Sequence, residues 1–128
     1  MSAFTKVFLF LGGANAALVV AMGAFGAHAL KTRISSDMMA VYHTAVLYHA
    51  IHALGLIAIG LVAAWLPDSG YLKSAGWTMF AGIVLFSGSL YLLSVTGSRW
   101  LGAITPIGGV AFLLAWVLFC LAILKASN

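Results

Sequence analysis

Four long apolar runs without a charged side chain constrain this sequence more than any other feature. They cover residues 7–30, 41–66, 74–96 and 106–124, and none of them contains Asp, Glu, Lys or Arg. A membrane-spanning helix needs about 20 predominantly apolar residues, because the hydrocarbon core of a bilayer is about 30 Å thick. The runs therefore predict four membrane-spanning helices.

The composition excludes the other broad classes of protein. Only 6% of the 128 residues are charged and 64% are hydrophobic, whereas soluble domains contain about 25% charged residues. These values are incompatible with a soluble globule and with a disordered chain. Cys120 is the only cysteine, so a disulfide framework within the chain is excluded as well. What remains is an integral membrane protein.

Short polar segments connect the four runs at residues 31–40, 67–73 and 97–105. Short connections between successive spans require antiparallel neighbours. The sequence therefore predicts an all-α fold, an integral membrane four-helix up-down bundle, formed by a single transmembrane domain over residues 1–128.

Two of the helix starts carry recognisable caps. Ser36 stands directly before Asp37, which is the pattern of an N-cap followed by an acidic residue in the first turn. Thr105 followed by Pro106 predicts an N-cap and the first helical residue of the fourth span. We therefore expect Pro106 to start a helix and not to kink one.

The basic residues are too dispersed for a nucleic-acid site. The net charge of +4 comes from single side chains along an apolar chain, so the expected contacts are membrane lipids and not nucleic acid. An up-down bundle divides the basic residues three against three between its ends, which leaves the orientation undetermined by charge counts. Lys6 beside the first span favours cytoplasmic termini, and we expect a multi-pass protein of the bacterial inner (plasma) membrane.

Small residues at helical spacing predict where the spans pack. In lipid, helices associate through close van der Waals contact, so small residues four apart mark helix interfaces. Gly13, Ala17 and Ala21 form such a ridge on the first span. The other glycines expected to serve packing are Gly23, Gly26, Gly88, Gly108 and Gly109.

The polar residues of the four spans collect in one half of the membrane. We call the end of the bundle that holds Lys31 side A and the opposite end side B. Spans one and three end at side A, and spans two and four begin there, so their polar stretches should meet in that half. Helical periodicity places three of these residues on one face of the second span and two on a stripe of the third. The predicted cluster comprises His28, Tyr48, His49, His52, Ser87, Ser89, Tyr91 and Thr105.

Three interpretations of this cluster stay open. The histidines can be neutral and hydrogen-bonded, holding helices together. They can ligate a metal or a haem, with His28, His49 and His52 as the candidate ligands. The cluster can also form a pocket for a quinone, a lipid headgroup or another small ligand, with Tyr48 and Tyr91 as hydrogen-bonding walls. Structural zinc sites usually include thiolates or carboxylates, and Cys120 falls near side B, so no metal and no cofactor is predicted.

Catalysis is not expected from this sequence. No carboxylate lies inside a span to act as an acid or to orient a histidine, and the single thiol has no neighbouring base. We therefore predict a non-enzymatic accessory or scaffold protein that forms a homo-oligomer or joins a larger membrane complex. Two alternatives stay open: a binder of a small ligand or cofactor (quinone, lipid, haem or metal) in the polar cluster, and a small oligomeric channel or permease.

Four ordered motifs resemble a known family. They are Gly23-Ala-Phe-Gly-Ala-His28, Tyr48-His49 with His52-Ala-Leu54, Phe86-Ser-Gly-Ser-Leu-Tyr91 and Thr105-Pro-Ile-Gly-Gly109. With these motifs the chain resembles, over nearly its whole length, the small bacterial membrane family known as domain of unknown function 423, whose eukaryotic relatives are called transmembrane protein 256. In that family Gln usually follows the tyrosine of the second motif, so His49 departs from the pattern whereas His52 matches it. The resemblance implies a four-span inner-membrane protein and supplies no catalytic residues.

Overall fold

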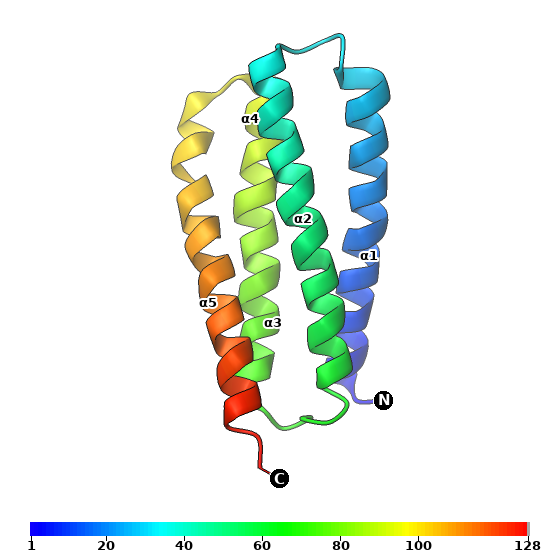
Figure 1. Ribbon diagram of the computed structural model, residues 1–128, viewed down its shortest axis with the longest axis vertical. Coiled ribbons are helices and arrows are strands. Elements are labelled where there is room, and N and C mark those ends of the chain that lie inside the picture. Colours follow the sequence, from blue (N-terminus) through cyan, green and yellow to red (C-terminus); the bar gives the residue numbers. More distant parts are fainter. Residues whose placement is uncertain (128) are drawn as a thin grey trace.

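The computed structural model describes residues 1–127 and forms an up-down bundle of four helical rods (Figure 1). All four rods are long and apolar enough to cross a membrane. The prediction of an all-α four-span bundle is therefore confirmed. The elements along the chain are α1 (Ala3–Phe25), the π-helical turn η1 (Gly26–Leu30), α2 (Ser36–Val62), α3 (Gly70–Gly82), the π-helical turn η2 (Ile83–Ser87), α4 (Gly88–Thr96), the 3-10 turn η3 (Arg99–Ala103) and α5 (Thr105–Leu124).

The N-cap of the helix that forms the second span lies one residue earlier than predicted. Ser35 has an extended backbone, with φ −64° and ψ 161°, and its hydroxyl accepts a hydrogen bond from the N–H of Met38 at 3.2 Å. Ser36 is already the first helical residue. Of two adjacent serines, the cap is the one at which the backbone changes from extended to helical.

The start of α5 also differs from the prediction. Thr105 is the first residue of the helix and not its N-cap, while Pro106 occupies the first turn as expected. The Thr105 hydroxyl lies 2.6 Å from the Ser89 hydroxyl of α4. Thr105 therefore forms a contact between helices instead of capping its own.

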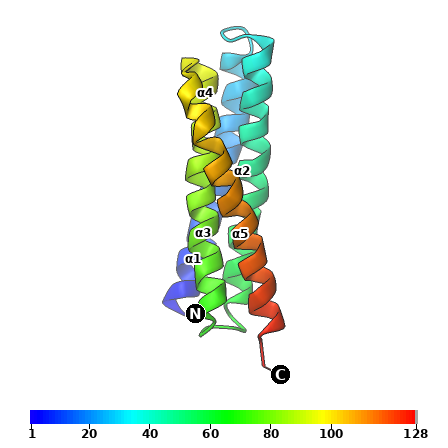
Figure 2. The ribbon, with the colours of Figure 1, turned by 90° about the vertical axis from the view of Figure 1, so that its left-hand side faces the viewer.

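Two rods occupy the middle of the bundle and two lie outside them. We call α3, η2 and α4 together the third rod. α1 packs mainly on α2, and α5 packs on α3 and η2, as Figures 1 and 2 show. The side B half is filled by an apolar core that includes Phe8, Leu56, Ile59, Leu72 and Met79. The polar interior extends from the middle of the bundle, where Asn15, His49 and His52 lie, toward side A.

The close contact between α1 and α2 runs through Gly12. A Cβ on Gly12 would lie 2.7 Å from the backbone nitrogen of Ile57, so the two backbones touch here. Gly13, Ala17 and Ala21 are exposed instead, and Gly13 has open space beside it. Within the chain, the close contact of α1 therefore uses the flank at Gly12 and leaves the predicted ridge facing outward, because α1 carries small residues on both flanks.

A second close contact joins α1 to α2 nearer side A. Gly26 lies directly against the ring of Tyr42. The Tyr42 hydroxyl donates a hydrogen bond to the carbonyl of Met22 at 2.5 Å. The absence of a side chain at Gly26 therefore lets the tyrosine reach the backbone of α1.

Gly108 has the corresponding role between α5 and the third rod. A Cβ at this position would lie 2.7 Å from the Cα of Phe86 and closer still to its backbone nitrogen. Gly108 therefore lies at a close contact between α5 and the third rod. Three other predicted packing glycines make no tight contact: Gly23, Gly88 and Gly109.

Candidate functional site

His49 joins three helices in the middle of the bundle. Its side chain is buried, and its Nδ1 lies 2.9 Å from the hydroxyl of Tyr91 in α4. Its Nε2 lies 2.8 Å from Oδ1 of Asn15 in α1. The amide nitrogen of Asn15 donates in turn to the carbonyl of Leu11 at 2.8 Å. A single side chain of α2 therefore connects α1 with α4.

The carbonyl of Leu11 determines which ring nitrogen of a neutral His49 carries the hydrogen. A carbonyl can only accept, so Asn15 must turn its NH₂ group toward Leu11 and its Oδ1 toward His49. The hydrogen of the imidazole then resides on Nε2, and Nδ1 accepts from the Tyr91 hydroxyl. In this neutral tautomer, each of the three hydrogen bonds has one donor and one acceptor.

His52 turns toward α5 instead. Its Nε2 accepts a hydrogen bond from the indole N–H of Trp116 at 3.0 Å, and its Nδ1 donates to the carbonyl of Tyr48 at 2.7 Å. Because an indole N–H only donates and a carbonyl only accepts, His52 is neutral and carries its hydrogen on Nδ1. The ring is stacked on Phe112, with the centroids 3.5 Å apart and an angle of 7° between the planes.

The two buried histidines do not converge on a common centre. They hold opposite tautomers, contact different helices, and use all four ring nitrogens for bonds within the chain. Among residues 1–127, no group of three or more His, Cys, Asp or Glu side chains is placed to hold a metal ion. This geometry disfavours the alternative in which His49 and His52 share one ligand.

Hydroxyl groups of the third rod complete the polar interior. Ser87 is fully buried and donates to the carbonyl of Ala45 in α2 at 2.9 Å. Ser89 pairs with Thr105 of α5. Throughout residues 1–127, every buried side-chain nitrogen and oxygen has a hydrogen-bond partner. The predicted meeting of the second span with the stripe of the third is therefore seen at Ser87 and at Tyr91.

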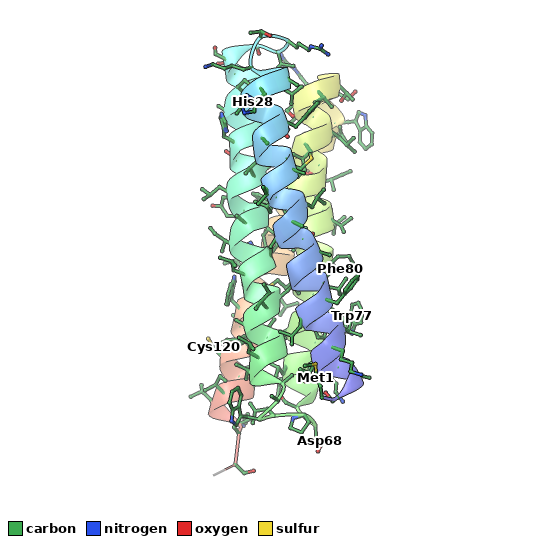
Figure 3. All side chains as sticks on the ribbon, turned by 90° about the vertical axis from the view of Figure 1, so that its right-hand side faces the viewer. Met1, His28, Asp68, Trp77, Phe80 and Cys120 are labelled. Atoms are coloured by element: carbon green, nitrogen blue, oxygen red, sulfur yellow. The ribbon has the colours of Figure 1, made fainter. Side chains whose placement is uncertain are left out.

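Two residues of the predicted cluster lie outside this network. His28 is exposed near side A, where Figure 3 labels it, and it is not among the hydrogen-bond partners of His49 or His52. His28 lies two residues from each of the buried Gly26 and Leu30 and therefore occupies the opposite face of the helix. Tyr48 borders the network through its backbone carbonyl, while its side chain lies at the lipid-facing surface and is 39% exposed.

Sequence reasoning missed several residues that complete the site. Asn15 is not one of them: as the lone amide of the first span it is predicted to form a hydrogen bond between helices, and its Oδ1 accepts from His49 of α2. Phe86, Phe112 and Trp116 look like ordinary apolar residues of their spans, and nothing in the pattern singles them out. The aromatic side of the site therefore becomes visible only in three dimensions.

The π-helical turn η2 was likewise unpredicted. The N–H of Gly88 donates to the carbonyl of Ile83, five residues earlier, which is the hydrogen bond of a π-helix. Turns of this kind occur frequently at functional sites. Here the turn presents Phe86 to α5 and Ser87 to α2, so it serves both faces of the third rod.

Two lipid-facing grooves flank the polar interior. The first, which we call the aromatic groove, measures about 550 Å³ and lies between α2 and α5. The second measures about 470 Å³ and lies between α1 and the third rod, with His49, Ser87 and Tyr91 in its wall. The aromatic groove is lined by Tyr48, His52, Phe86, Phe112, Trp116 and Gly109, together with Ile51, Pro106, Val110 and Leu113.

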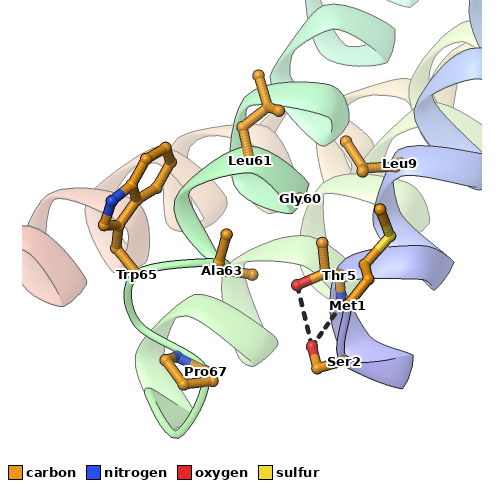
Figure 4. A pocket seen from close by; sticks show the side chains of 10 residues that line it. Met1, Ser2, Thr5, Leu9, Gly60, Leu61, Ala63, Trp65 and Pro67 are labelled. Atoms are coloured by element: carbon orange, nitrogen blue, oxygen red, sulfur yellow. Dashed lines mark hydrogen bonds between the residues drawn. The ribbon is translucent and has the colours of Figure 1, made fainter.

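A further hollow lies at side B, between the start of α1 and the end of α2 (Figure 4). The Ser2 hydroxyl accepts from the backbone N–H of Thr5 at 3.1 Å and donates to the Thr5 hydroxyl at 2.9 Å. The polar side chains in this hollow therefore cap α1, which is a structural role.

Comparison with known proteins gives a consistent result. The family described as "Protein of unknown function (DUF423)" matches residues 22–109. The UPF0382 membrane protein YwdK of Bacillus subtilis (strain 168) is 54% identical over 120 residues, covering 94% of this chain and 98% of the relative. A UPF0382 membrane protein of Staphylococcus epidermidis (strain ATCC 12228 / FDA PCI 1200) is 48% identical over 123 residues, covering 96% of this chain and 99% of the relative. No solved structure is significantly similar to the chain.

Proposed function

The chain belongs to the DUF423 family of membrane proteins of unknown function, and we propose that it acts as a non-enzymatic accessory protein, a scaffold that associates with other membrane helices. One observation carries this proposal. The buried polar side chains of residues 1–127 are all engaged in hydrogen bonds within the chain, and the longest-range of these join one helix to another. The interior therefore serves to hold the four rods together.

The apolar core weighs against the channel alternative for a single copy. Phe8, Leu56, Ile59, Leu72 and Met79 are fully buried and fill the side B half of the bundle. A channel or permease needs polar groups along a path between the two ends. In the part of the chain that the structure describes, the polar network stops where this core begins.

The lipid-facing side of α1 is the surface that suits association. Gly13, Ala17 and Ala21 are exposed there, while the tight packing of α1 on α2 uses Gly12. Small residues four apart let another helix approach closely in lipid. In this proposal the ridge receives the same ridge of a second copy, which makes the scaffold a homo-oligomer.

The test is the native mass of the protein released from native-lipid particles. We expect the wild type at a multiple of 13.4 kDa. The double variant Gly13→Leu/Ala17→Leu should be monomeric with unchanged thermal unfolding, because neither position packs within the chain. Ala81→Leu, a matched change on the exposed face of α3, should leave the assembly intact. A monomeric wild type, or an assembly that survives filling of the ridge, would contradict the proposal.

We further propose that the protein lies in a bacterial inner membrane with both termini cytoplasmic. Both ends of the chain lie at side B (Figure 1). Lys6 directly precedes the apolar part of α1, and positive residues beside the first span favour the cytoplasmic side. The remaining basic side chains do not decide the orientation, since they are shared between the two ends.

Thiol labelling tests this orientation. In a Cys120→Ser background, Ser127→Cys should resist a membrane-impermeant thiol reagent in intact spheroplasts and react after permeabilisation. Thr32→Cys, in the exposed loop at side A, should react in both conditions. The reverse pattern would place the termini outside, and equal labelling of both sites in intact spheroplasts would indicate dual insertion.

A further inference from the structure

The aromatic groove contains a polar group that the bundle does not use. The ring of Tyr48 packs on Phe86 with the centroids 4.6 Å apart. Its hydroxyl makes no hydrogen bond to any group of residues 1–127, whereas those of Tyr42 and Tyr91 are both bonded. Tyr48 lies about 18 Å along α2 from Ser36, inside the hydrocarbon region. A donor without a partner at this depth is strongly unfavourable, so the geometry calls for an acceptor from outside the chain.

The groove presents flat aromatic surfaces beside this hydroxyl. The plane of the Tyr48 ring lies within 9° of that of His52 and within 14° of that of Phe112. Its centroid is 6.3 Å from one ring and 6.4 Å from the other, although these two rings are stacked on each other. The equal distances place Tyr48 beside the stacked pair and not on top of it. The parallel rings suit a planar aromatic or quinoid ligand, since such rings associate by offset stacking.

The groove is open both at its floor and toward the lipid. Gly109 contributes no side chain, and a Cβ there would meet only the Phe86 ring, at 3.8 Å. Val110 and Leu113 are 64% and 69% exposed at the rim. A ligand could therefore enter laterally from the bilayer and leave an apolar tail among the lipids.

We propose that the aromatic groove binds a membrane-dissolved molecule made of a planar ring with carbonyl oxygens and an apolar tail, which is the chemistry of a quinone. The Tyr48 hydroxyl donates to a ring carbonyl, and the ring lies against the aromatic side chains. Acyl chains carry no acceptor, and the ester groups of lipids lie at the edge of the hydrocarbon region. Both nitrogens of His52 are already engaged, so the groove offers a haem no axial ligand from that residue. This site goes beyond the scaffold function and does not depend on it.

Trp116, in the wall of the groove, provides the reporter for a binding test. Three other tryptophans are exposed, so replacing each with Phe leaves a protein in which Trp116 is the sole indole; they are Trp65, Trp77 and Trp100. This protein in lipid nanodiscs is titrated with a short-tailed benzoquinone, which quenches indole fluorescence on contact. We expect saturable quenching of Trp116.

Two variants of the protein that has Trp116 as its sole indole test whether the quenching arises from binding in the aromatic groove. Tyr48→Phe removes only a hydroxyl without an internal partner, so thermal unfolding should be unchanged while the affinity falls about tenfold, the effect of one hydrogen bond in an apolar site. Gly109→Leu fills the groove and should abolish saturable quenching. Gly13→Leu makes the same change on the exposed face of α1, away from the groove, and should leave the affinity unaltered.

Three results would overturn the proposal. Quenching that rises linearly without saturation would mean that the probe only partitions into the lipid. Unchanged affinity in Tyr48→Phe would remove the hydrogen bond from recognition. Equal competition by an alkane that matches the probe's tail but lacks the ring would assign the groove to acyl chains. Each readout is independent of the oligomeric state, so the result stands whether or not the ridge on α1 forms dimers.

Discussion

Replacing Gly108 with leucine is expected to separate α5 from the third rod and to prevent the bundle from assembling. The new Cβ would fall on the backbone nitrogen of Phe86 and 2.7 Å from its Cα. Overpacking costs about 1–3 kcal/mol when neighbouring side chains can adjust. A helix backbone cannot adjust in this way without moving the rod, so we expect a loss of at least about 3 kcal/mol. Unfolding in mixed micelles, followed by circular dichroism, measures the difference.

The adjacent glycine supplies the matched control for this experiment. In Gly109→Leu the Cβ meets only a ring atom of Phe86 at 3.8 Å, an ordinary van der Waals contact. The same substitution one residue later should therefore change the free energy of unfolding by less than about 0.5 kcal/mol. Equal destabilisation by the two leucines would show that an effect common to both variants, such as altered membrane insertion, and not the contact with Phe86, determines the loss.

The second large effect is expected at His49. In His49→Leu the oxygen of Asn15 and the hydroxyl of Tyr91 both lose their partner inside the bundle. An unsatisfied buried polar group costs about 1–3 kcal/mol, so two such groups should lower the free energy of unfolding by about 2–6 kcal/mol. His49→Gln should be milder, because an amide side chain can donate toward Asn15 and accept from Tyr91. The same unfolding assay measures both variants.

The triple variant His49→Leu/Asn15→Leu/Tyr91→Phe distinguishes hydrogen bonding from packing. Removing every partner of a polar network together can be nearly neutral, whereas removing one leaves the others unsatisfied. We therefore expect the triple variant to recover most of the stability that His49→Leu loses. If the triple variant is as unstable as the sum of its changes, the three side chains stabilise the bundle through their shapes.

Much of the fold follows from the sequence, because the thickness of the bilayer sets the length of each membrane-spanning helix. The uncharged runs predicted all four rods, and the short connections between them predicted antiparallel neighbours. The start of a helix was predicted less accurately from its apolar run than from its capping residues. α2 starts at Ser36, five residues before the predicted span, because its first turns lie outside the apolar run.

The candidate site was predicted in outline and not in its contacts. The stripe on the third span correctly placed Ser87 and Tyr91 opposite the second span. His28 lies at the predicted end of the bundle but is exposed, because its depth along the first span does not determine the direction of its side chain. The spacing of His49 and His52 suggested a shared ligand, yet each ring follows the nearest available partner, Asn15 for one and Trp116 for the other.

By itself, the sequence determined that four helices cross the membrane in alternating directions, and it predicted that polar residues of different helices meet. Only the tertiary structure decided how each helix is rotated about its own axis. A soluble helix reveals its inward face through an apolar stripe, but these helices are apolar on every side. Their rotation depends instead on close fits such as Gly12 against α2 and Gly108 against Phe86, and on which polar groups find partners. These contacts form between residues far apart in the chain, so the sequence does not reveal them. The rotation that they impose on α2 turns His49 and His52 to partners inside the bundle and leaves the hydroxyl of Tyr48 free in the aromatic groove.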